Sequence, residues 1–510
     1  MKPLGILIAI LLGISWAALA QSQASPQESP PFPMTIPGDP VFPDRTIDIR
    51  DCGAVGDGLT LNTQAFARAI NGCAEAGGGK VLVPPGIWLT GAIHLRSHVN
   101  LHIQEGAEIR FSTDPDDYLP PVFVRWAGFE CYNYSPLIYA RDCQNIAITG
   151  DGCLNGQGPY WWDWAELQDR VAGELYALVL KETPVENRVF GNPEEPLRPQ
   201  FIQPIDCDNV LIEGISILAG PFWTVHAVYC EDFIARGVKV ITDGPNNDGI
   251  NLDSCKNALV EDCFLWTGDD CVAIKSGLNE DGWRVGRPCE NVIVRHCRME
   301  RGHGGVVIGS EMSGGVRNIY VHDCEFSGTE IGIRLKSTRG RGGVVENVWC
   351  RNLRMGHIEQ DAIRIRTDYK AWFGSETGAP PFFRNINMER ISCDRAKSAV
   401  RILGLPERFI EGVTLKNLSI RSEEGVSVRN AEGIRLEGCS IRPQSGPVVQ
   451  LKSVTDAEIR RFIPSGAEET LLEVLGDKCG GIQIEECDLS TFARPIVGGE
   501  GTVSVKNRSE

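Results

Sequence analysis

CKNALVEDCFLW (residues 255–266) and CENVIVRHCRM (residues 289–299) contain the phrase that decides the fold: Asn, alternating apolar residues, then Cys or an apolar residue. The Asn residues of this phrase are Asn145, Asn209, Asn257, Asn291, Asn318, Asn347 and Asn385. From Asn257 the steps are 34, 27, 29 and 38 residues, and degenerate copies follow in EGVTLKNLSI, EGIRLEGCSI and GGIQIEECDL. Each copy is too short to hold its own core. Short period-two strands separated by Gly and Asn turns therefore predict an all-β solenoid of stacked parallel strands, a parallel β-helix.

Cysteine residues keep fixed places in these repeats. One group of Cys residues lies two positions before a repeat Asn: Cys143, Cys207, Cys255 and Cys289. Cys230 lies two positions before Asp232 in the same way. A second group lies six positions after a repeat Asn: Cys263, Cys297 and Cys324. Equivalent positions in successive coils stack at about 4.8 Å, so we expect two columns of small buried hydrophobic residues. The sequence leaves open any disulfide pairing among the 18 Cys, and no close Cys pair has the spacing of a zinc finger.

The chain begins with the pattern of an exported protein. Residues 1–20 have a basic start, an apolar run and a small-residue ending, which predicts a signal peptide and a secreted or periplasmic location. Residues 21–45 are rich in Pro, Ser and Gln and predict an extended leader rather than packed structure. No later stretch approaches the ~18 apolar residues of a membrane span. We expect residues 46–510 to form a single β-helix catalytic domain, as a monomer.

An amphipathic helix is expected before the coils. It begins near Asn62, has apolar residues at Ala65, Phe66, Ala69 and Ile70, and is stopped by the glycines at 77–79. A helix at the open end of a solenoid shields its core and its unpaired strand edges.

The net charge of −17 argues against nucleic acid as a partner, since binding there depends on basic contacts to phosphate. An anionic partner of any kind needs positive charge gathered in one place. The segments before each repeat show such a place when they are aligned on their alternating apolar pairs, Val272 and Ile274 in one of them. The residues between the apolar pairs then point outward.

Stacked coils place these outward residues in columns. One column contains His226, Asn251, Ala273, Val307, Arg334, Arg364 and Arg401. The next contains Asp253, Lys275, Gly309, Lys336 and Arg366. Asp248 aligns with Asp270, and Asn247, Asp269 and His303 form a neighbouring column. The candidate substrate-binding residues on this face are His226, Asn251, Lys275, Arg334, Lys336 and Arg364.

Asp248, Asp269 and Asp270 are the candidate catalytic residues, with His303 one coil further on. A single Asp at a β-helix turn is more often structural, because its side chain bonds nearby backbone. Crowded carboxylates have their pKa values pushed apart, so one can serve as acid and another as base, which is the division of labour in glycosidic hydrolysis. The cationic strip suits a carbohydrate that carries carboxylates, since Arg binds them in pairs of hydrogen bonds.

The motifs NNDG (246–249), GDDC (268–271), GHG (302–304) and RLK (334–336), in this order, resemble the four signature motifs of polygalacturonases, the pectin hydrolases of glycoside hydrolase family twenty-eight. The resemblance runs from about Ile47 through the solenoid. It implies a right-handed parallel β-helix that needs no cofactor or metal and acts on pectic galacturonan, an anionic polysaccharide. It also implies that Asp269 is the general acid and that Asp248 and Asp270 activate water in an inverting mechanism.

The same resemblance implies that Arg334 and Lys336 bind the galacturonate carboxylate, and that Asn246 and His303 belong to the site. Two positions depart from the family pattern: Asn247, where Thr is common, and Leu335, where Ile is common. Rhamnogalacturonan, xylogalacturonan and short pectic oligomers therefore stay open as substrates. The long insertion between Cys153 and Asn209 favours exo action by walling off one end of the groove.

Two other readings stay open. A pectate lyase uses a parallel β-helix on the same polymer, usually with Ca²⁺, and the Asp248, Asp269 and Asp270 cluster offers oxygen ligands for that ion. A non-catalytic β-helix that binds pectin is the second. The lyase predicts an unsaturated product and inhibition by chelator, and the binding protein predicts that Asp269→Asn changes little.

Overall fold

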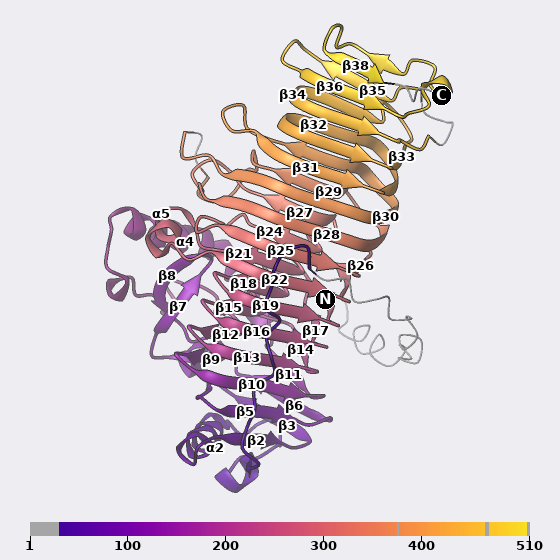
Figure 1. Cartoon of the computed structure of the whole chain (residues 1–510). Helices are drawn as coiled ribbons and strands as arrows, with labels where there is room; N and C mark the ends of the chain where they lie inside the picture. The colour runs from indigo at the N-terminus through magenta and orange to yellow at the C-terminus, as the bar shows by residue number, and fades with distance from the viewer. Residues whose placement is uncertain (1–29, 375–376, 465–468, 507–510) are drawn as a thin grey trace. The chain divides into compact units, whose positions relative to one another are not determined.

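The computed structural model describes residues 30–374, 377–464 and 469–506, so the expected signal peptide lies outside the described residues. Two units are distinguished, residues 1–33 and residues 34–510, and every helix and strand of the described residues lies in the second. Within it, parallel strands stack coil upon coil from the α2 end to the C-terminal strands (Figure 1). None of the described helices is long and apolar enough to cross a membrane.

Three strands form most coils up to residue 343, and each kind of strand stacks into its own ladder. The first ladder contains β1 (Thr46–Asp48), β2 (Gly79–Val83), β5 (Val99–Ile103), β10 (Gln144–Gly150), β13 (Asp208–Glu213), β16 (Glu231–Arg236), β19 (Lys256–Glu261), β22 (Cys289–Arg295) and β25 (Val316–His322). The second contains β3 (Gly86–Thr90), β6 (Ala107–Phe111), β11 (Cys153–Asn155), β14 (Ser216–Leu218), β17 (Lys239–Ile241), β20 (Phe264–Trp266), β23 (Arg298–Arg301) and β26 (Glu325–Phe326). The third contains β4 (Ile93–His94), β9 (Ile138–Arg141), β12 (Ile202–Ile205), β15 (Val225–Val228), β18 (Ile250–Asp253), β21 (Val272–Lys275), β24 (Val306–Ile308), β27 (Ile331–Lys336) and β29 (Asp361–Arg366).

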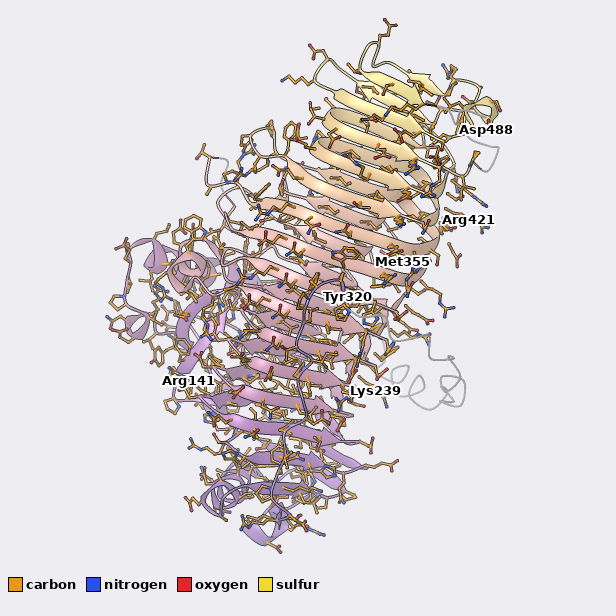
Figure 2. The ribbon with its side chains drawn as sticks, viewed as in Figure 1. Arg141, Lys239, Tyr320, Met355, Arg421 and Asp488 are labelled. Carbon is orange, nitrogen blue, oxygen red and sulfur yellow. The ribbon has the colours of Figure 1, made fainter. Side chains whose placement is uncertain are left out.

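Further strands, some of them much longer, continue the stack toward the C-terminus. They are β28 (Val344–His357), β30 (Phe382–Leu403), β31 (Ile410–Lys416), β32 (Ser419–Glu437), β33 (Ser440–Pro443), β34 (Val449–Arg460), β35 (Leu472–Leu475), β36 (Gly480–Glu485), β37 (Ile496–Val497) and β38 (Val503–Lys506). Side chains cover the outside of the coils throughout, as Figure 2 shows around Arg141 on β9 and Tyr320 on β25.

The repeat Asn residues explain how successive coils stay in register. Each has a positive φ of 50 to 59°, a left-handed conformation that Asn tolerates better than most residues. From Asn291 to Asn385 their side chains form a ladder in which each amide donates to the oxygen of the preceding repeat Asn, for example Asn291 to Asn257 at 3.1 Å and Asn318 to Asn291 at 3.0 Å. The repeated Asn thus turns the chain and satisfies its own amide at the same time.

Both Cys columns are buried, as expected, and all 18 Cys, which fall within the described ranges, carry free thiols. The capping helix is also confirmed, since α2 spans Thr63–Glu75 and buries Ala65, Phe66, Ala69 and Ile70. Residues 34–45 form no strand or helix, but Met34 and Phe42 pack on an outward apolar strip of the first ladder, and Asp39 pairs with Arg236 at 2.9 Å. This part of the leader is therefore packed, contrary to the expectation from its composition.

A second apolar cluster lies beside the third ladder and is called the wall here. It draws on four segments, residues 122–133, 165–201, 278–285 and 369–374, together with Phe222 and Trp223. The antiparallel pair β7 (Val122–Trp126) and β8 (Phe129–Asn133) belongs to it, as do α4 (Ala165–Leu180) and α5 (Asn279–Val285). The short helix α3 (Pro159–Trp162) precedes α4, and its Trp161 packs in the main core of the solenoid. Figure 1 shows α4, α5, β7 and β8 gathered on the left, next to β18, β21 and β24. The insertion expected to wall off the groove thus joins three other segments.

Short 3₁₀ helices complete the regular structure of the described residues. They are Ile49–Cys52, Pro115–Tyr118, Val185–Asn187 and Leu489–Thr491.

Candidate active site

The third ladder brings the predicted columns together in the predicted register. His226 pairs with Asn251, Asn251 with Ala273, Ala273 with Val307, Val307 with Arg334, and Arg334 with Arg364. In the neighbouring column, Asp253 pairs with Lys275, and Lys336 with Arg366. Backbone hydrogen bonds link Asn247 to Asp269 and Asp269 to His303. The carboxylates and cations therefore converge on one face, as the alignment predicted.

Two glycines let the turns that carry the carboxylates stack closely. A Cβ on Gly268, directly before Asp269, would lie 2.1 Å from the carbonyl oxygen of Gly244. A Cβ on Gly249, directly after Asp248, would lie 2.5 Å from the carbonyl oxygen of Cys271. Both contacts are too short for a side chain, so glycine is required where the two turns meet.

The three carboxylates lie at different depths. The side chains of Asp248 and Asp270 are 3% and 1% exposed, whereas that of Asp269 is 18% exposed. Asp269 is therefore the most accessible of the three carboxylates. The exposed fraction of the side chain thus distinguishes the three aspartates, which their spacing in the sequence did not do.

Asp270 is held by the two cations of the RLK motif. Lys336 donates to Oδ2 at 2.7 Å, and Arg334 donates to Oδ1 at 3.4 Å. Both cations also lie over the ring of Tyr369, 5.7 and 5.5 Å from its centre. Tyr369 belongs to the wall and was missed by the sequence analysis, because nothing in RTDYK (366–370) marks it as part of the motif set.

Asp269 pairs with His303, whose Nδ1 lies 3.0 Å from Oδ1 of Asp269. Burial raises the pKa of Asp269, but the hydrogen bond from His303 and the charges of Lys336, His303 and Lys275 outweigh it and bring the pKa to about 2. The same hydrogen bond raises the pKa of His303 to about 9 against the effect of burial, with help from the charges of Asp269, Glu330 and Asp270. The pair is therefore an imidazolium facing a carboxylate at neutral pH.

Asp248 has the opposite character. Burial raises the pKa of Asp248 well above its usual value, and the nearby Asp269 and Asp270 add to this, while Lys275 and Lys336 oppose it. Of the Asp248 and Asp269 carboxyls, that of Asp248 is therefore the one whose surroundings favour the protonated form. The pKa values of these two carboxyls are thus pushed in opposite directions, as crowding predicted.

Lys275 faces buried carboxylates rather than open solvent. Its ammonium lies 3.5 Å from Oδ2 of Asp248, 2.8 Å from Oε2 of Glu311, and 4.4 Å from the centre of the Trp223 ring. The expected contact with substrate is therefore replaced by a charge contact within the site. Glu311 and Trp223 were missed, although each lies close to a motif, after GHGGVVIGS (302–310) and in GPFWTVHAVYC (220–230).

His226 and Asn251 are in the predicted column but do not reach the solvent. Both are fully buried, and His226 bonds Gln203 at 2.7 Å and Asp253 at 3.3 Å. Burial lowers the pKa of His226 in spite of the Asp253 carboxylate. Periodicity correctly predicted that these side chains point out of the solenoid, but it could not show that other segments cover them. Contact of either residue with substrate is thus contradicted.

Arg364 is partly buried and bonded to its own coil. It donates to Asp361, and its NH2 donates to Oε1 of Gln360 at 3.1 Å. Arg364 therefore already has acceptors, and it lies one coil beyond Arg334 and Lys336.

Asn246 is oriented by a residue of the wall. The fully buried Arg198 donates from NH2 to Oδ1 of Asn246 at 2.7 Å, and from its other nitrogens to Gln168 and to the carbonyl oxygens of Pro221 and Pro245. Arg can only donate, so the amide nitrogen of Asn246 is the atom left for another partner. Arg198 was missed because it lies in the insertion, outside all four motifs.

The cluster does not suit Ca²⁺. Each of the three carboxylates faces a cation: Asp248 faces Lys275, Asp269 faces the His303 imidazolium, and Asp270 faces Lys336. A divalent cation placed between them would lie against these positive charges, which argues against the lyase reading. Among the described residues no other group of His, Cys, Asp and Glu has the arrangement of a metal site.

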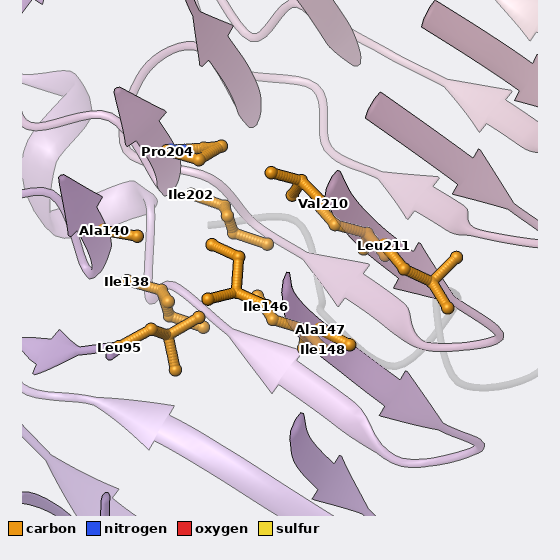
Figure 3. Close-up of a pocket in the computed structure, with 11 residues that line it drawn as sticks. Leu95, Ile138, Ala140, Ile146, Ala147, Ile148, Ile202, Pro204, Val210 and Leu211 are labelled. Atoms are coloured by element: carbon orange, nitrogen blue, oxygen red, sulfur yellow. The ribbon is translucent and has the colours of Figure 1, made fainter. Parts of the chain in front are cut away.

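A small cavity inside the solenoid is unrelated to the site. It measures about 10 Å³ and is lined by apolar side chains such as Leu95, Ile138 and Val210 (Figure 3). It has neither the volume nor the polar groups to hold a sugar.

Comparison with known proteins agrees with this geometry. Residues 186–441 match the family model described as glycosyl hydrolases family 28. A protein named "Probable polygalacturonase" from Vitis vinifera is 31% identical over 383 residues, which are 72% of this chain and 73% of that protein. The "Exo-poly-alpha-D-galacturonosidase" of Dickeya chrysanthemi is 25% identical over 351 residues, which are 64% of this chain and 57% of that protein.

A solved structure extends the agreement to the fold. The crystal structure of a hyperthermoactive exopolygalacturonase from Thermotoga maritima has a TM-score of 0.73 and 38% sequence identity, over 80% of this chain and 94% of that chain. The expected right-handed parallel β-helix is thereby confirmed. The chain therefore belongs to glycosyl hydrolases family 28 and is a polygalacturonase-like glycoside hydrolase.

Proposed function

We propose that the protein is exported and hydrolyses α-1,4-galacturonosyl linkages of polygalacturonate by single displacement with inversion, acting from chain ends. The observation that carries the proposal is the meeting of Asp248, Asp269 and Asp270 on one face beside Arg334 and Lys336. The relatives named for polygalacturonase activity support the substrate, and the secretory pattern of residues 1–20 supports export.

The buried Asp248 and Asp270 and the more accessible Asp269 take different parts in the reaction. Asp248 and Asp270 hold the attacking water, and Asp270 accepts its proton. Asp269 donates a proton to the bridging oxygen and draws on the adjacent His303 imidazolium. Inversion requires the water and the leaving oxygen to lie on opposite faces of the sugar, with acid and base ~6.5–9.5 Å apart.

The cations bind the substrate carboxylate next to the reacting bond. Arg334 and Lys336 lie within reach of Asp270, so a bound uronate shares them with a catalytic group. Asn246 offers its amide nitrogen to a sugar oxygen, because Arg198 occupies its carbonyl oxygen. Arg364 lies in the next coil on the same face, where it would contact the substrate beyond this position.

The wall supports attack at chain ends. Its four segments are tied together beside the site: Asn279 donates to the carbonyl oxygen of Phe373 at 2.9 Å, and Tyr176 donates to Glu280 at 3.0 Å. A rigid barrier beside the carboxylates limits how far a polymer can extend past them. The Thermotoga maritima and Dickeya chrysanthemi relatives, named as exo-acting, point the same way.

The experiment is to incubate the purified protein with polygalacturonate in the presence of chelator. Reducing ends, ultraviolet absorbance of unsaturated product, and product length are followed together. Reducing ends without new absorbance, with monomer or dimer as the only early product, are expected. Asp269→Asn should lower the rate by ~10²–10⁴-fold, the usual contribution of general acid catalysis, while Asp262→Asn, an exposed Asp at another turn, should not.

Any other result would overturn a specific part of the proposed function. A ladder of longer oligomers would overturn end-directed attack alone. Activity on rhamnogalacturonan without activity on polygalacturonate would overturn the substrate. Unsaturated product would establish a lyase, and no activity on any uronic polymer would overturn catalysis itself.

A further inference from the structure

A line of polar side chains continues from Asp269 over the following coils. Nδ1 of His303 lies 3.0 Å from Asp269, and Nε2 lies 3.6 Å from Oε1 of Glu330. Gln360 donates to Oε2 of Glu330 at 3.1 Å, and Arg364 donates to Oε1 of Gln360 at 3.1 Å. Backbone hydrogen bonds from Glu330 to Gly302 and from Gln360 to Glu330 stack the coils that carry these residues.

The chemistry of the end groups fixes the direction of this line. Arg364 can only donate, so Gln360 must present its oxygen to Arg364 and its amide nitrogen to Glu330. At the other end, His303 lies between two carboxylates: Asp269 is hydrogen-bonded to Nδ1 at 3.0 Å, and Glu330 lies at ion-pair distance from Nε2, 3.6 Å away. An imidazole in that position satisfies both neighbours only when both of its nitrogens carry hydrogen.

We propose that Glu330, oriented by Gln360, is a positioning residue that holds His303 as an imidazolium directed at Asp269. The inference rests on the proposed hydrolysis and deepens it, because it identifies what keeps a proton beside the acid. Arg364 is the far end of this line and orients Gln360, in addition to the substrate contact proposed above.

The groups that face His303 come from two neighbouring coils. Asp269 and Asp270 belong to the turn before β21, and Glu330 and Arg334 belong to the coil of β27. Arg334 donates to the backbone oxygen of His303 at 3.3 Å, so its guanidinium is the positive charge nearest to the ring in this set. The carboxylates outnumber it, which favours the charged imidazole.

Each proton in the hydrolysis has a donor and an acceptor among these residues, the water and the solvent. His303 gives its Nδ1 proton to Asp269 as Asp269 gives a proton to the bridging oxygen and the bond from that oxygen to the anomeric carbon breaks. The water oxygen bonds to the anomeric carbon, and Asp270 takes the proton of the water. Asp270 then releases this proton to solvent, and the half-exposed His303 regains one, so the net reaction is the addition of one water.

The test is a titration of His303 in the full chain without substrate. The ¹⁵N shifts of its imidazole are followed with pH in the wild type, in Glu330→Gln and in Glu359→Gln, and the signal is assigned by its loss in His303→Asn. Glu359 is an exposed residue next to Gln360, so its variant loses the same charge outside the line. The pH dependence of kcat/KM on oligogalacturonate is measured on the same proteins.

We expect the His303 midpoint to fall by about one pH unit in Glu330→Gln, the lower end of the shift for a nearby charge, since Glu330 is partly exposed. It should not move in Glu359→Gln, and the alkaline limb of kcat/KM should follow the midpoint. An unchanged midpoint in Glu330→Gln overturns the inference, as does a neutral His303 in the wild type at pH 7, which needs no variant to fold. A shifted midpoint in a protein inactive on every uronic polymer would instead refute the proposed function and leave the pairing intact.

Discussion

Lys336 reaches back over the coil of His303 and donates a 2.7 Å hydrogen bond to Asp270, two coils earlier in the solenoid. Both side chains are buried, at 9% and 1% exposure. The cation that would bind the substrate carboxylate thus already stabilises a catalytic carboxylate in the ligand-free protein. Substrate binding and water activation therefore depend on the same ammonium group.

Replacing Lys336 with Met should therefore impair both steps. Loss of one partner from a buried, hydrogen-bonded charge pair costs about 2–5 kcal/mol, so kcat/KM on oligogalacturonate should fall by at least tenfold, with kcat falling and KM rising. Arg334→Met should have a smaller effect on kcat, because its contact with Asp270 is 3.4 Å. Lys416→Met, on β31, is the control for loss of a lysine. A rise in KM with kcat unchanged would show that Lys336 binds substrate only.

Lys275 and Glu311 should be coupled in stability. Lys275→Met leaves the Glu311 and Asp248 carboxylates without their ammonium partner in a buried site, which should cost about 3–5 kcal/mol of unfolding free energy. The double variant Lys275→Met, Glu311→Gln should lose much less than the sum of the single changes. Urea unfolding of the four proteins measures this cycle, and strictly additive losses would refute the coupling.

Arg198 and Asn246 should act as one unit in substrate binding. Arg198→Met frees the Asn246 amide to rotate, so it and Asn246→Ala should each reduce kcat/KM by about tenfold, the loss of one hydrogen bond of about 1.4 kcal/mol. The double variant should be little worse than either single one. Multiplication of the two losses would mean that Arg198 does not act through Asn246. Thermal unfolding of each variant separates this effect from loss of the folded wall.

The Asp269 and His303 pair predicts how stability changes with pH. The pKa of His303 rises to about 9 from an ordinary 6.5, so its contribution is complete below pH 6.5 and is lost as pH rises through about 9. The pKa of Asp269 falls to about 2 from 3.8, so its contribution is present above pH 3.8 and is lost as pH falls through about 2. Solvent screening reduces the contribution of His303 to the free energy of unfolding, because its side chain is 47% exposed.

His303→Asn should remove the decline in stability between pH 6.5 and 9 that is expected of the wild type. Denaturant midpoints at a series of pH values measure it. The same slope in both proteins would mean that His303 is not the group that titrates in this range.

The sequence predicted the coils and the face of the site because both follow from a period of two. Once Val272 and Ile274 were placed inside, Ala273 and Lys275 had to point outward, and the strand register agrees. The four ordered motifs then identified Asp248, Asp269, Asp270, His303, Arg334 and Lys336. These residues lie at turns or strand ends of the solenoid itself.

Burial of the outward residues could not be predicted in the same way. His226, Asn251 and Lys275 are covered or paired by residues far away in the sequence, among them Gln203, Trp223 and Glu311. The wall is assembled from four separate segments, and no local pattern in any of them indicates that it packs beside the third ladder. The pKa values of Asp248 and Asp269 could not be predicted from the sequence either, since they depend on burial and on charges from several coils.

The most direct test of inverting hydrolysis at the Asp248, Asp269 and Asp270 cluster is ¹H NMR of the first products released from polygalacturonate. We expect new reducing ends to appear first as the β anomer, since the linkage is α and one displacement inverts it, and no signal of an unsaturated uronate. The α anomer as first product would contradict single displacement, and an unsaturated end would contradict hydrolysis.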